Sequence, residues 1–234
     1  MSDFLHTAVF GLYPYIALTV LAIGSIIRYD REPYSWRAGS SQLLRRRQLI
    51  LGSVLFHLGV LVIFFGHLGG LLTPIAVFDA LGISHGAKQV LAIVAGGVAG
   101  LFALIGASLL LHRRLFDARI RSNTSFADMA ILLLLYAQLL LGLGTIPVSM
   151  THLDGHEMVT FMNWAQGIFT FQSDAAQSIT GAHWVFKMHI FLGLTIFLVF
   201  PFTRLVHMFS APVRYVFRSG YQIVRRKPAK GGGK

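Results

Sequence analysis

The sequence predicts an all-α integral membrane protein with five transmembrane helices, its N-terminus outside and its C-terminus in the cytoplasm. Two observations predict this class. The 234-residue chain is 55% hydrophobic and only 12% charged, which is far more apolar than a soluble domain of this length. Its apolar residues also gather in five runs long enough to cross a hydrocarbon core about 30 Å thick as helices.

The five runs follow one another with polar connections between them. They cover residues 5–27, 49–72, 89–111, 127–147 and 184–209. The long connection at 148–183 contains an apolar stretch, 158–171, that predicts a short interfacial helix. We expect residues 1–228 to form a single transmembrane domain. The Gly- and Lys-rich residues 229–234 are predicted to be a disordered tail.

The basic residues fix the predicted orientation. The formal net charge is +11, and 18 of the 20 Lys and Arg residues fall between the first and second runs, between the third and fourth, or at and after the end of the fifth. Only Lys88 and Lys187 lie on the other side. Cytoplasmic loops of membrane proteins carry this excess, so it orients the chain and leaves no reason to invoke a nucleic-acid partner.

Four histidines lie within or at the edges of the apolar runs, where an ionisable residue is costly and usually functional. His57 and His67 belong to the second run, and His189 and His207 to the fifth. The two runs cross in opposite directions. Depth therefore pairs His67 with His189 near the outer side and His57 with His207 near the cytoplasm.

Two imidazoles at each level suit axial ligation of a haem, whose porphyrin supplies the other four nitrogen ligands. A bare zinc ion would need four ligands converging on one point. The chain has no cysteine, which excludes a thiolate-bound cluster and a c-type haem linkage. Glycines beside the histidines, namely Gly59, Gly66, Gly69, Gly70 and Gly193, are predicted to leave room for a flat cofactor.

The spacing of the histidines is unequal. His57 and His67 are ten residues apart, about 15 Å along a helix, whereas His189 and His207 are eighteen apart, about 27 Å. Straight parallel helices would not match both pairs. We expect tilt, or a kink at Pro201, to shorten the difference.

Two other interpretations of the histidines stay open at this point. They could be polar residues bonded to neighbouring helices, or they could form the proton relay of a transporter. The remaining histidines lie at run ends or in connections and are predicted to be solvated: His6, His85, His112, His152, His156 and His183.

Several stretches resemble the gamma subunit of respiratory nitrate reductase, a di-haem cytochrome b, over about residues 13–226. They include Tyr13-Pro14-Tyr15-Ile16-Ala17, Arg28-Tyr29-Asp30, Trp36-Arg37-Ala38, Phe56-His57-Leu58-Gly59, Gly66-His67, Leu72-Thr73-Pro74, Arg113-Arg114-Leu115-Phe116 and Pro201-Phe202-Thr203-Arg204-Leu205-Val206-His207. The resemblance implies two haem b groups, an inner one ligated by His57 and His207 and an outer one ligated by His67 and His189. It also implies the five-helix fold and the orientation given above.

By the same resemblance, the subunit oxidises quinol near the outer face of the bacterial cytoplasmic (inner) membrane. Lys88, Gly66 and His67 would belong to the quinol site. The electrons would pass to a cytoplasmic iron–sulfur subunit and, through it, to a molybdenum subunit that reduces nitrate. A cytochrome b anchor of another quinone-linked complex, of the sulfur or heterodisulfide type, is the nearer alternative.

Two further expectations concern the cytoplasmic side. Arg204, three residues before His207, could pair with a haem propionate, because guanidinium binds carboxylate in a fork. The iron–sulfur subunit is expected to dock on residues 28–47, 112–126 and 210–228.

Lys88, on the outer side, is unusual for a separate reason. It lies near the predicted N-terminal end of a helix, where the macrodipole disfavours a cation.

Overall fold

A computed structural model describes residues 3–36 and 44–210, and within these residues the protein consists of helices and their connections. Five helical segments are long and apolar enough to span a membrane: Asp3–Arg31, Arg46–Leu72, His85–Phe116, Phe126–Ser149 and Trp184–Phe202. The first four predicted spans are therefore confirmed as helices, and the fifth is confirmed as far as Phe202. The predicted tail at 229–234 lies outside the described residues.

The described chain contains fourteen helical elements, and the first three of them join to form the first span. The elements of the described chain, in order, are α1 (Asp3–Thr7), a π-helical turn (Ala8–Leu12), α2 (Tyr13–Arg31), a 3-10 turn (Pro33–Ser35), α3 (Arg46–Leu72), α4 (Ile75–Ala80), α5 (His85–Phe116), α6 (Ala118–Ser122), α7 (Phe126–Ser149), α8 (His156–Phe169), η3 (Ala175–Ile179), α9 (Trp184–Val199), η4 (Phe200–Phe202) and η5 (Arg204–Ser210).

Helices α5, α6 and α7 begin at Ser or Asp side chains that accept hydrogen bonds from their first N–H groups. Ser84 accepts a hydrogen bond from the backbone N–H of Ala87 at the start of α5, and Ser125 accepts one from Asp128 at the start of α7. Asp117 accepts two, from Arg119 and Ile120, at the start of α6. Ser and Asp are favoured at this position because their oxygens replace the missing carbonyl partners.

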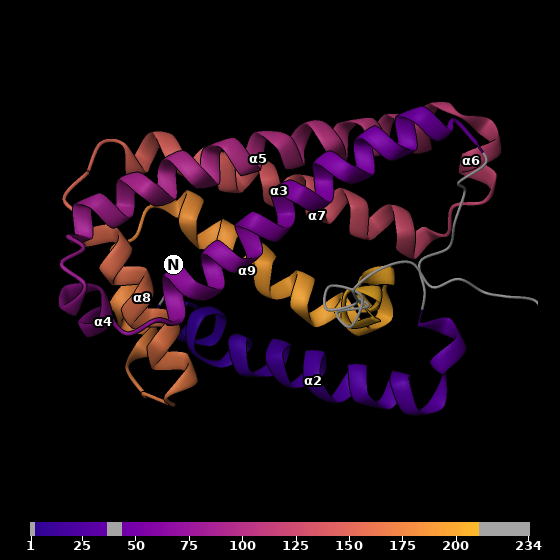
Figure 1. Cartoon of the computed structure of the whole chain (residues 1–234). Helices are drawn as coiled ribbons and strands as arrows, with labels where there is room; N and C mark the ends of the chain where they lie inside the picture. The colour runs from indigo at the N-terminus through magenta and orange to yellow at the C-terminus, as the bar shows by residue number, and fades with distance from the viewer. Residues whose placement is uncertain (1–2, 37–43, 211–234) are drawn as a thin grey trace, which may run out of the picture.

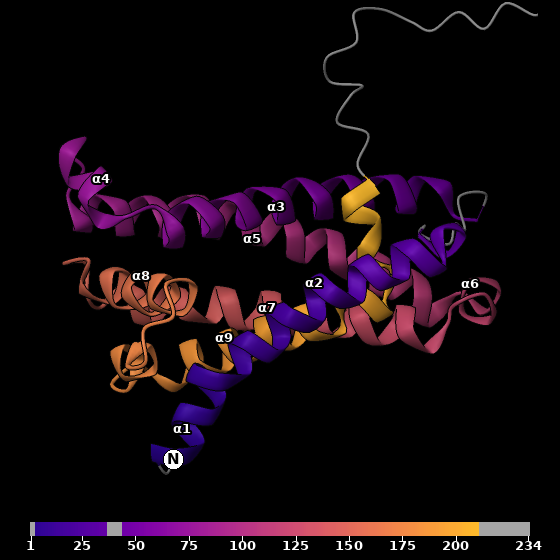
Figure 2. The same ribbon diagram turned by 90° about the horizontal axis from the view of Figure 1, so that it is seen from below.

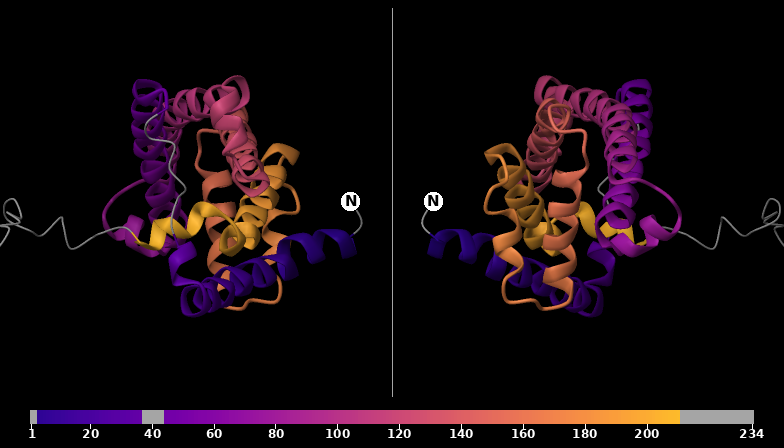
Figure 3. Two further views of the ribbon diagram at one scale, coloured as in Figure 1. Left: turned by 90° about the vertical axis from the view of Figure 1, so that its right-hand side faces the viewer. Right: turned by 90° about the vertical axis from the view of Figure 1, so that its left-hand side faces the viewer.

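The long helices pack as neighbours in the order α3, α5, α7, α9 and α2. Figure 3 looks along the bundle and shows this succession. The short helices α4 and α8 lie at one end and α6 at the other (Figure 1). Helix α8, in the region where the sequence predicts a short helix, packs through Met162, Trp164, Ala165 and Ile168, all buried. In the described residues, α3 and α9 are not packed along each other.

Helices α3 and α5 approach closely through small residues. A Cβ atom on Gly59 would collide with the backbone of Ala99 and Ala103, and one on Gly106 would collide with Gly52 and Phe56. Small residues let helix backbones approach in this way inside a membrane. The prediction that Gly59 leaves room for a cofactor is therefore wrong, because this glycine serves helix packing.

The fifth span bends before it reaches its last histidine. The α-helix ends at Val199, a short 3-10 turn covers Phe200–Phe202, and Thr203 is extended with φ −120° and ψ 177°. The chain then turns toward α3 as η5 (Figure 2). A continuous helix to residue 209 was the wrong prediction. The bend expected near Pro201 is confirmed, since Pro201 cannot donate an N–H bond back to the helix.

Candidate functional site

The bend brings His207 to His57. The ring centroids of these two histidines lie 6.2 Å apart, and those of His67 and His189 lie 6.1 Å apart. Each pair joins α3 to the fifth span, and each is the pair that depth in the membrane predicts. Because η5 leaves the line of α9, the eighteen-residue spacing no longer has to match the ten-residue spacing along parallel axes.

The separation within each pair fits a haem iron between the rings. A metal–imidazole nitrogen bond is about 2.0 Å long, and that nitrogen lies about 1.1 Å from its ring centre, so two axial imidazoles have centroids roughly 6 Å apart. No three His, Cys, Asp or Glu side chains in the described ranges, 3–36 and 44–210, group to hold a bare metal ion. The donor set is thus two isolated imidazole pairs, which suits a macrocycle that brings its own nitrogens.

Hydrogen bonds hold three of the four rings in a ligand-like tautomer. Nδ1 of His57 donates to the carbonyl oxygen of Ser53 at 2.7 Å, and Nδ1 of His67 donates to that of Ile63 at 2.8 Å. Nδ1 of His207 donates to the carbonyl of Arg204. A neutral imidazole that donates from Nδ1 keeps Nε2 unprotonated, and that nitrogen is then available to a metal.

His189 is held differently, by residues of α7. The amide nitrogen of Gln138 donates to the carbonyl of His189 at 3.1 Å and lies 3.4 Å from its Nε2. Nδ1 of His189 is buried and has no hydrogen-bond partner. A Cβ on Gly142 would lie 3.0 Å from Cε1 of the ring, so the glycine makes space for it.

Gln138 is a site residue that sequence reasoning missed. The signal was available, because it is an isolated amide inside the apolar run of the fourth span, and polar groups at that depth usually have a specific partner. Gly193, one turn after His189, faces this amide, and a Cβ atom on Gly193 would lie 3.1 Å from the amide nitrogen. The predicted role of Gly193 beside a cofactor is therefore wrong, since its open side is filled by Gln138.

The glycines near the end of α3 lie in open surroundings. Cβ atoms built on Gly66, Gly69 and Gly70 would meet nothing within 4 Å. These three positions follow or adjoin His67 on the chain, so the region beside the outer pair has room that a larger side chain would occupy. That a flat molecule occupies this space stays a prediction.

Lys88 is buried, with 8% of its surface exposed, and its ammonium has specific partners. Nζ donates to the carbonyl of Gly70 at 2.8 Å and to the sulfur of Met162 at 2.8 Å, and it lies 3.7 Å from the ring centre of Phe78. The C-terminal carbonyls of α3 carry partial negative charge, which favours a cation. The partner helix thus compensates for the unfavourable N-terminal position of Lys88 on α5.

A second donor caps the same end of α3. The side-chain amide of Gln166, on α8, donates to the carbonyls of Leu71 and Thr73, both at 3.0 Å. Lys88 and Gln166 together satisfy three carbonyls that a helix end leaves without partners. They tie the segment after His67 to α5 and α8.

Arg204 has a carboxylate partner within the protein. Its Nη1 lies 3.7 Å from Oδ1 of Asp128, at the start of α7. Both side chains are partly buried, with 24% and 22% of their surfaces exposed. The predicted pairing of Arg204 with a haem propionate is a separate expectation.

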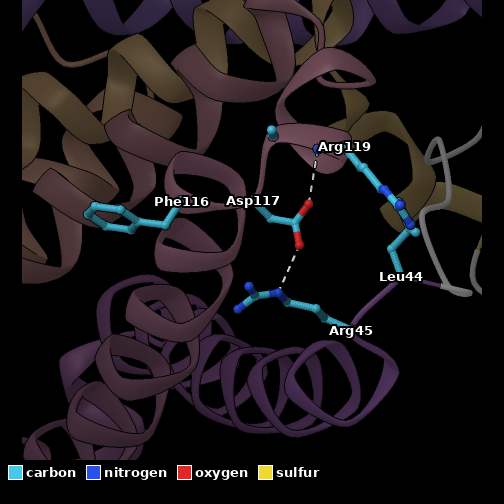
Figure 4. A pocket seen from close by; sticks show the side chains of 6 residues that line it. Leu44, Arg45, Phe116, Asp117 and Arg119 are labelled. Atoms are coloured by element: carbon cyan, nitrogen blue, oxygen red, sulfur yellow. Dashed lines mark hydrogen bonds and ion pairs between the residues drawn. The ribbon is translucent and has the colours of Figure 1, made fainter.

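The predicted docking surface includes a pocket of about 520 Å³ where the ends of α3 and α5 meet. Figure 4 shows Arg45 donating through Nε to Asp117 at 2.8 Å, beside Leu44, Phe116 and Arg119. Backbone and arginine hydrogen bonds hold the pKa of Asp117 below its usual value. Segment 210–228 of this surface lies, apart from residue 210, outside the described residues.

His6 departs from the expectation of a solvated histidine. It is buried, with 6% exposed, and its Nε2 donates to the carbonyl of Ala176 at 2.9 Å. This bond joins α1 to η3, so the start of the chain is fastened to the connection between α8 and α9. The hydrogen-bond partner, Ala176, lies 170 residues away along the chain, so the sequence around His6 does not show that its ring is buried.

The chain is similar to known proteins of one family over nearly its whole length. A family model for the nitrate reductase gamma subunit matches residues 6–227. The respiratory nitrate reductase 1 gamma chain of Escherichia coli K12 is 49% identical over 225 residues, 96% of this chain and 99% of that protein. The nitrate reductase gamma chain of Bacillus subtilis is 40% identical over 217 residues, 93% of this chain and 96% of that protein.

A more distant relative carries a different name. The Hdr-like menaquinol oxidoreductase cytochrome b-like subunit of Archaeoglobus profundus is 28% identical over 163 residues, 69% of this chain and 47% of that protein.

Five membrane-length helices define a multi-pass helical membrane protein. Matches over nearly the whole chain then give its family. The chain belongs to the nitrate reductase gamma subunit family and is a membrane subunit of an oxidoreductase complex.

Proposed function

We propose that this subunit oxidises quinol near the outer face of the bacterial cytoplasmic membrane and passes the electrons inward. Two b haems, an outer one between His67 and His189 and an inner one between His57 and His207, form the electron path. An iron–sulfur subunit on the cytoplasmic side receives the electrons for a molybdenum subunit that reduces nitrate. The N-terminus is outside and the C-terminus cytoplasmic.

The observation that carries the proposal is the pair of ring separations, 6.2 Å and 6.1 Å. Both match the roughly 6 Å that two imidazoles on one iron require. A haem bound by both histidines of a pair would leave its iron no open position for oxygen, so the chemistry it would supply is one-electron transfer. Hydrogen bonds from Nδ1 leave Nε2 free for iron in His57, His67 and His207, and Gln138 contacts the ring and backbone of His189.

Lys88 is the residue proposed to bind quinol. Its ammonium bonds to Gly70, three residues after His67 on α3, and its other hydrogen-bond acceptor is the Met162 sulfur. A thioether is a weak acceptor, so a quinol oxygen can replace it at low cost. Oxidation releases two electrons and two protons from each quinol, and the protons leave on the outer side.

The experiment is to purify the complex gently from membranes, identify its subunits, and record dithionite-reduced minus oxidised spectra. We expect two b-type components and co-purifying iron–sulfur and molybdenum subunits. His67→Ala should remove the outer component and His57→Ala the inner one, while His152→Ala, in an exposed connection, should remove neither. Equal loss of both components from either variant, in folded protein, would contradict the pairing.

A second candidate has one observation in its favour, the similarity to the Archaeoglobus profundus cytochrome b-like subunit. The chain would then be the haem-bearing anchor of another quinone-linked complex. Co-purification of thiol- or sulfur-reducing subunits, without a molybdenum subunit, would favour it. Purified protein with no b-type absorption would instead favour a histidine-dependent proton-coupled transporter.

A further inference from the structure

Arg28, near the end of α2, forms hydrogen bonds with the backbone of the bend that follows α9. Its Nη1 donates to the carbonyl of Pro201 at 2.6 Å and to that of Thr203 at 2.8 Å. Its Nε and Nη2 donate to the hydroxyl and the carbonyl of Ser35, at 3.2 and 3.1 Å. One guanidinium therefore connects α2, the turn after it and both sides of the bend.

The bend needs such a donor because it interrupts the helical hydrogen bonds. Thr203 is extended, so the carbonyls of Pro201 and Thr203 leave the pattern of a continuous helix. Carbonyls without partners are costly in an apolar environment. A planar guanidinium with several fixed N–H groups can serve two carbonyls and a neighbouring turn together, which an ammonium on a flexible stem cannot do in the same geometry.

Other contacts place the same face of α2 against the bend. A Cβ on Gly24, one turn before Arg28, would lie 2.9 Å from the Pro201 ring, so the two backbones approach closely there. Trp36, just after Ser35, packs its ring 6.1 Å from that of Phe209 in η5. The bend is thus bounded by residues of the first span and of the turn that follows it.

His207 lies four residues beyond Thr203, and the direction of η5 decides whether its ring meets His57. We propose that Arg28 is a positioning residue for His207, and through it for the inner haem. This inference rests on the proposed function, since it assigns Arg28 to one of the two proposed haem sites. The outer pair, held by His67 on α3 and His189 on the straight part of α9, does not depend on the bend.

The test compares Arg28→Met with Arg31→Met in the intact complex. Arg31 is an exposed arginine on the same helix, and its substitution leaves these contacts in place. In Arg28→Met we expect the inner component, about half of the b-haem absorbance, to be lost or shifted in midpoint potential, and the outer component to be retained. Arg28→Lys keeps the positive charge but loses the planar guanidinium with its several N–H groups. The inner component should therefore change in the same direction as in Arg28→Met, but by less.

Ser35→Ala provides a milder variant if Arg28→Met does not accumulate in membranes. This variant removes the hydroxyl that accepts a hydrogen bond from Nε of Arg28, and it should alter the inner component alone. Unchanged spectra in Arg28→Met, or equal loss of both components in Arg28→Lys and Ser35→Ala, would overturn the positioning role while leaving the proposed function intact. Absence of b-type absorption in the unaltered complex would overturn both.

Discussion

Among single residues, Lys88 shows best how two neighbouring helices change the meaning of a charge. On its own helix the ammonium lies at the unfavourable N-terminal end, but it also lies at the C-terminal end of α3, where it donates to Gly70. Its structural task and its proposed quinol-binding task use the same position. They can be separated because Gln166 also caps this end of α3, so the haem spectrum reports whether the helix end is intact and turnover reports quinol binding.

We predict that Lys88→Ala lowers quinol oxidation about tenfold, the equivalent of one lost charged hydrogen bond worth about 1.5 kcal/mol. Both b-haem components should remain. The measurement is quinol-dependent nitrate reduction together with the reduced-minus-oxidised spectrum. Lys187→Ala is the matched control, because Lys187 is the other lysine on the proposed outer side and bonds instead to the carbonyl of Thr180. Unchanged turnover in Lys88→Ala would remove it from the quinol site.

The site residues were predictable to different extents. His57, His67, His189 and His207 stand out in the sequence because each is a polar group in an apolar run. Their pairing follows from span direction alone. Gln138 could have been singled out as an isolated amide in an apolar run, but its partner His189 could not. The role of Arg28 was not predictable, because it donates to backbone carbonyls of a segment that only folding brings near. Arg28 looked like one more residue of the cytoplasmic charge excess.

At the scale of helices, the α3–α5 contact is the tightest feature of the bundle. Its closeness depends on glycine and alanine at facing positions, and Gly59 has no room for another carbon atom. Gly69, ten residues later on the same helix, has open surroundings. Comparing a substitution at Gly59 with the same substitution at Gly69 therefore distinguishes the loss of close helix packing from a general effect of altering α3.

We predict that Gly59→Ala destabilises the subunit by about 1–3 kcal/mol, the usual cost of overpacking a close contact. Gly69→Ala should be neutral or slightly stabilising, because alanine favours a helix more than glycine does. Thermal unfolding of the purified complex, followed by loss of the b-type spectrum, measures both. Equal midpoints for the two variants would show that α3 and α5 are not in contact at Gly59.

The helices themselves were predictable to within a few residues, because membrane thickness fixes how long an apolar run must be. The fifth span was the exception. Residues 200–209 are largely apolar, like the helix before them. Composition therefore predicts that the helix continues, although the backbone leaves the helical conformation there. Pro201 indicates that a bend occurs, but the direction of the bend depends on Arg28 and Gly24, which lie more than 170 residues earlier.

For the whole molecule, the five spans of the described residues underlie the proposed topology, in which the N-terminus is outside and the C-terminus cytoplasmic. His6 is bonded at the end of the bundle that holds η3, and α6 lies at the other end (Figure 1). The proposed topology places the α6 end in the cytoplasm, because most basic residues belong to connections on that side of the predicted spans.

This orientation predicts a simple labelling result. The chain has no cysteine, so a single introduced thiol can be followed without background. Ser122→Cys, exposed at the end of α6, should react with a membrane-impermeant maleimide only after the cells are opened. Ser173→Cys, exposed between α8 and η3, should react in intact cells. The reverse pattern would invert the proposed topology.

Both histidine pairs join the second span to the fifth, and this has a consequence for biosynthesis. A chain emerging from the ribosome carries His57 and His67 long before it carries His189 and His207. Until the fifth span inserts, neither site has more than half of its imidazoles. Insertion of the two proposed haems would therefore have to follow synthesis of nearly the entire subunit, and the proposed inner site, which also needs the bend, would be completed last.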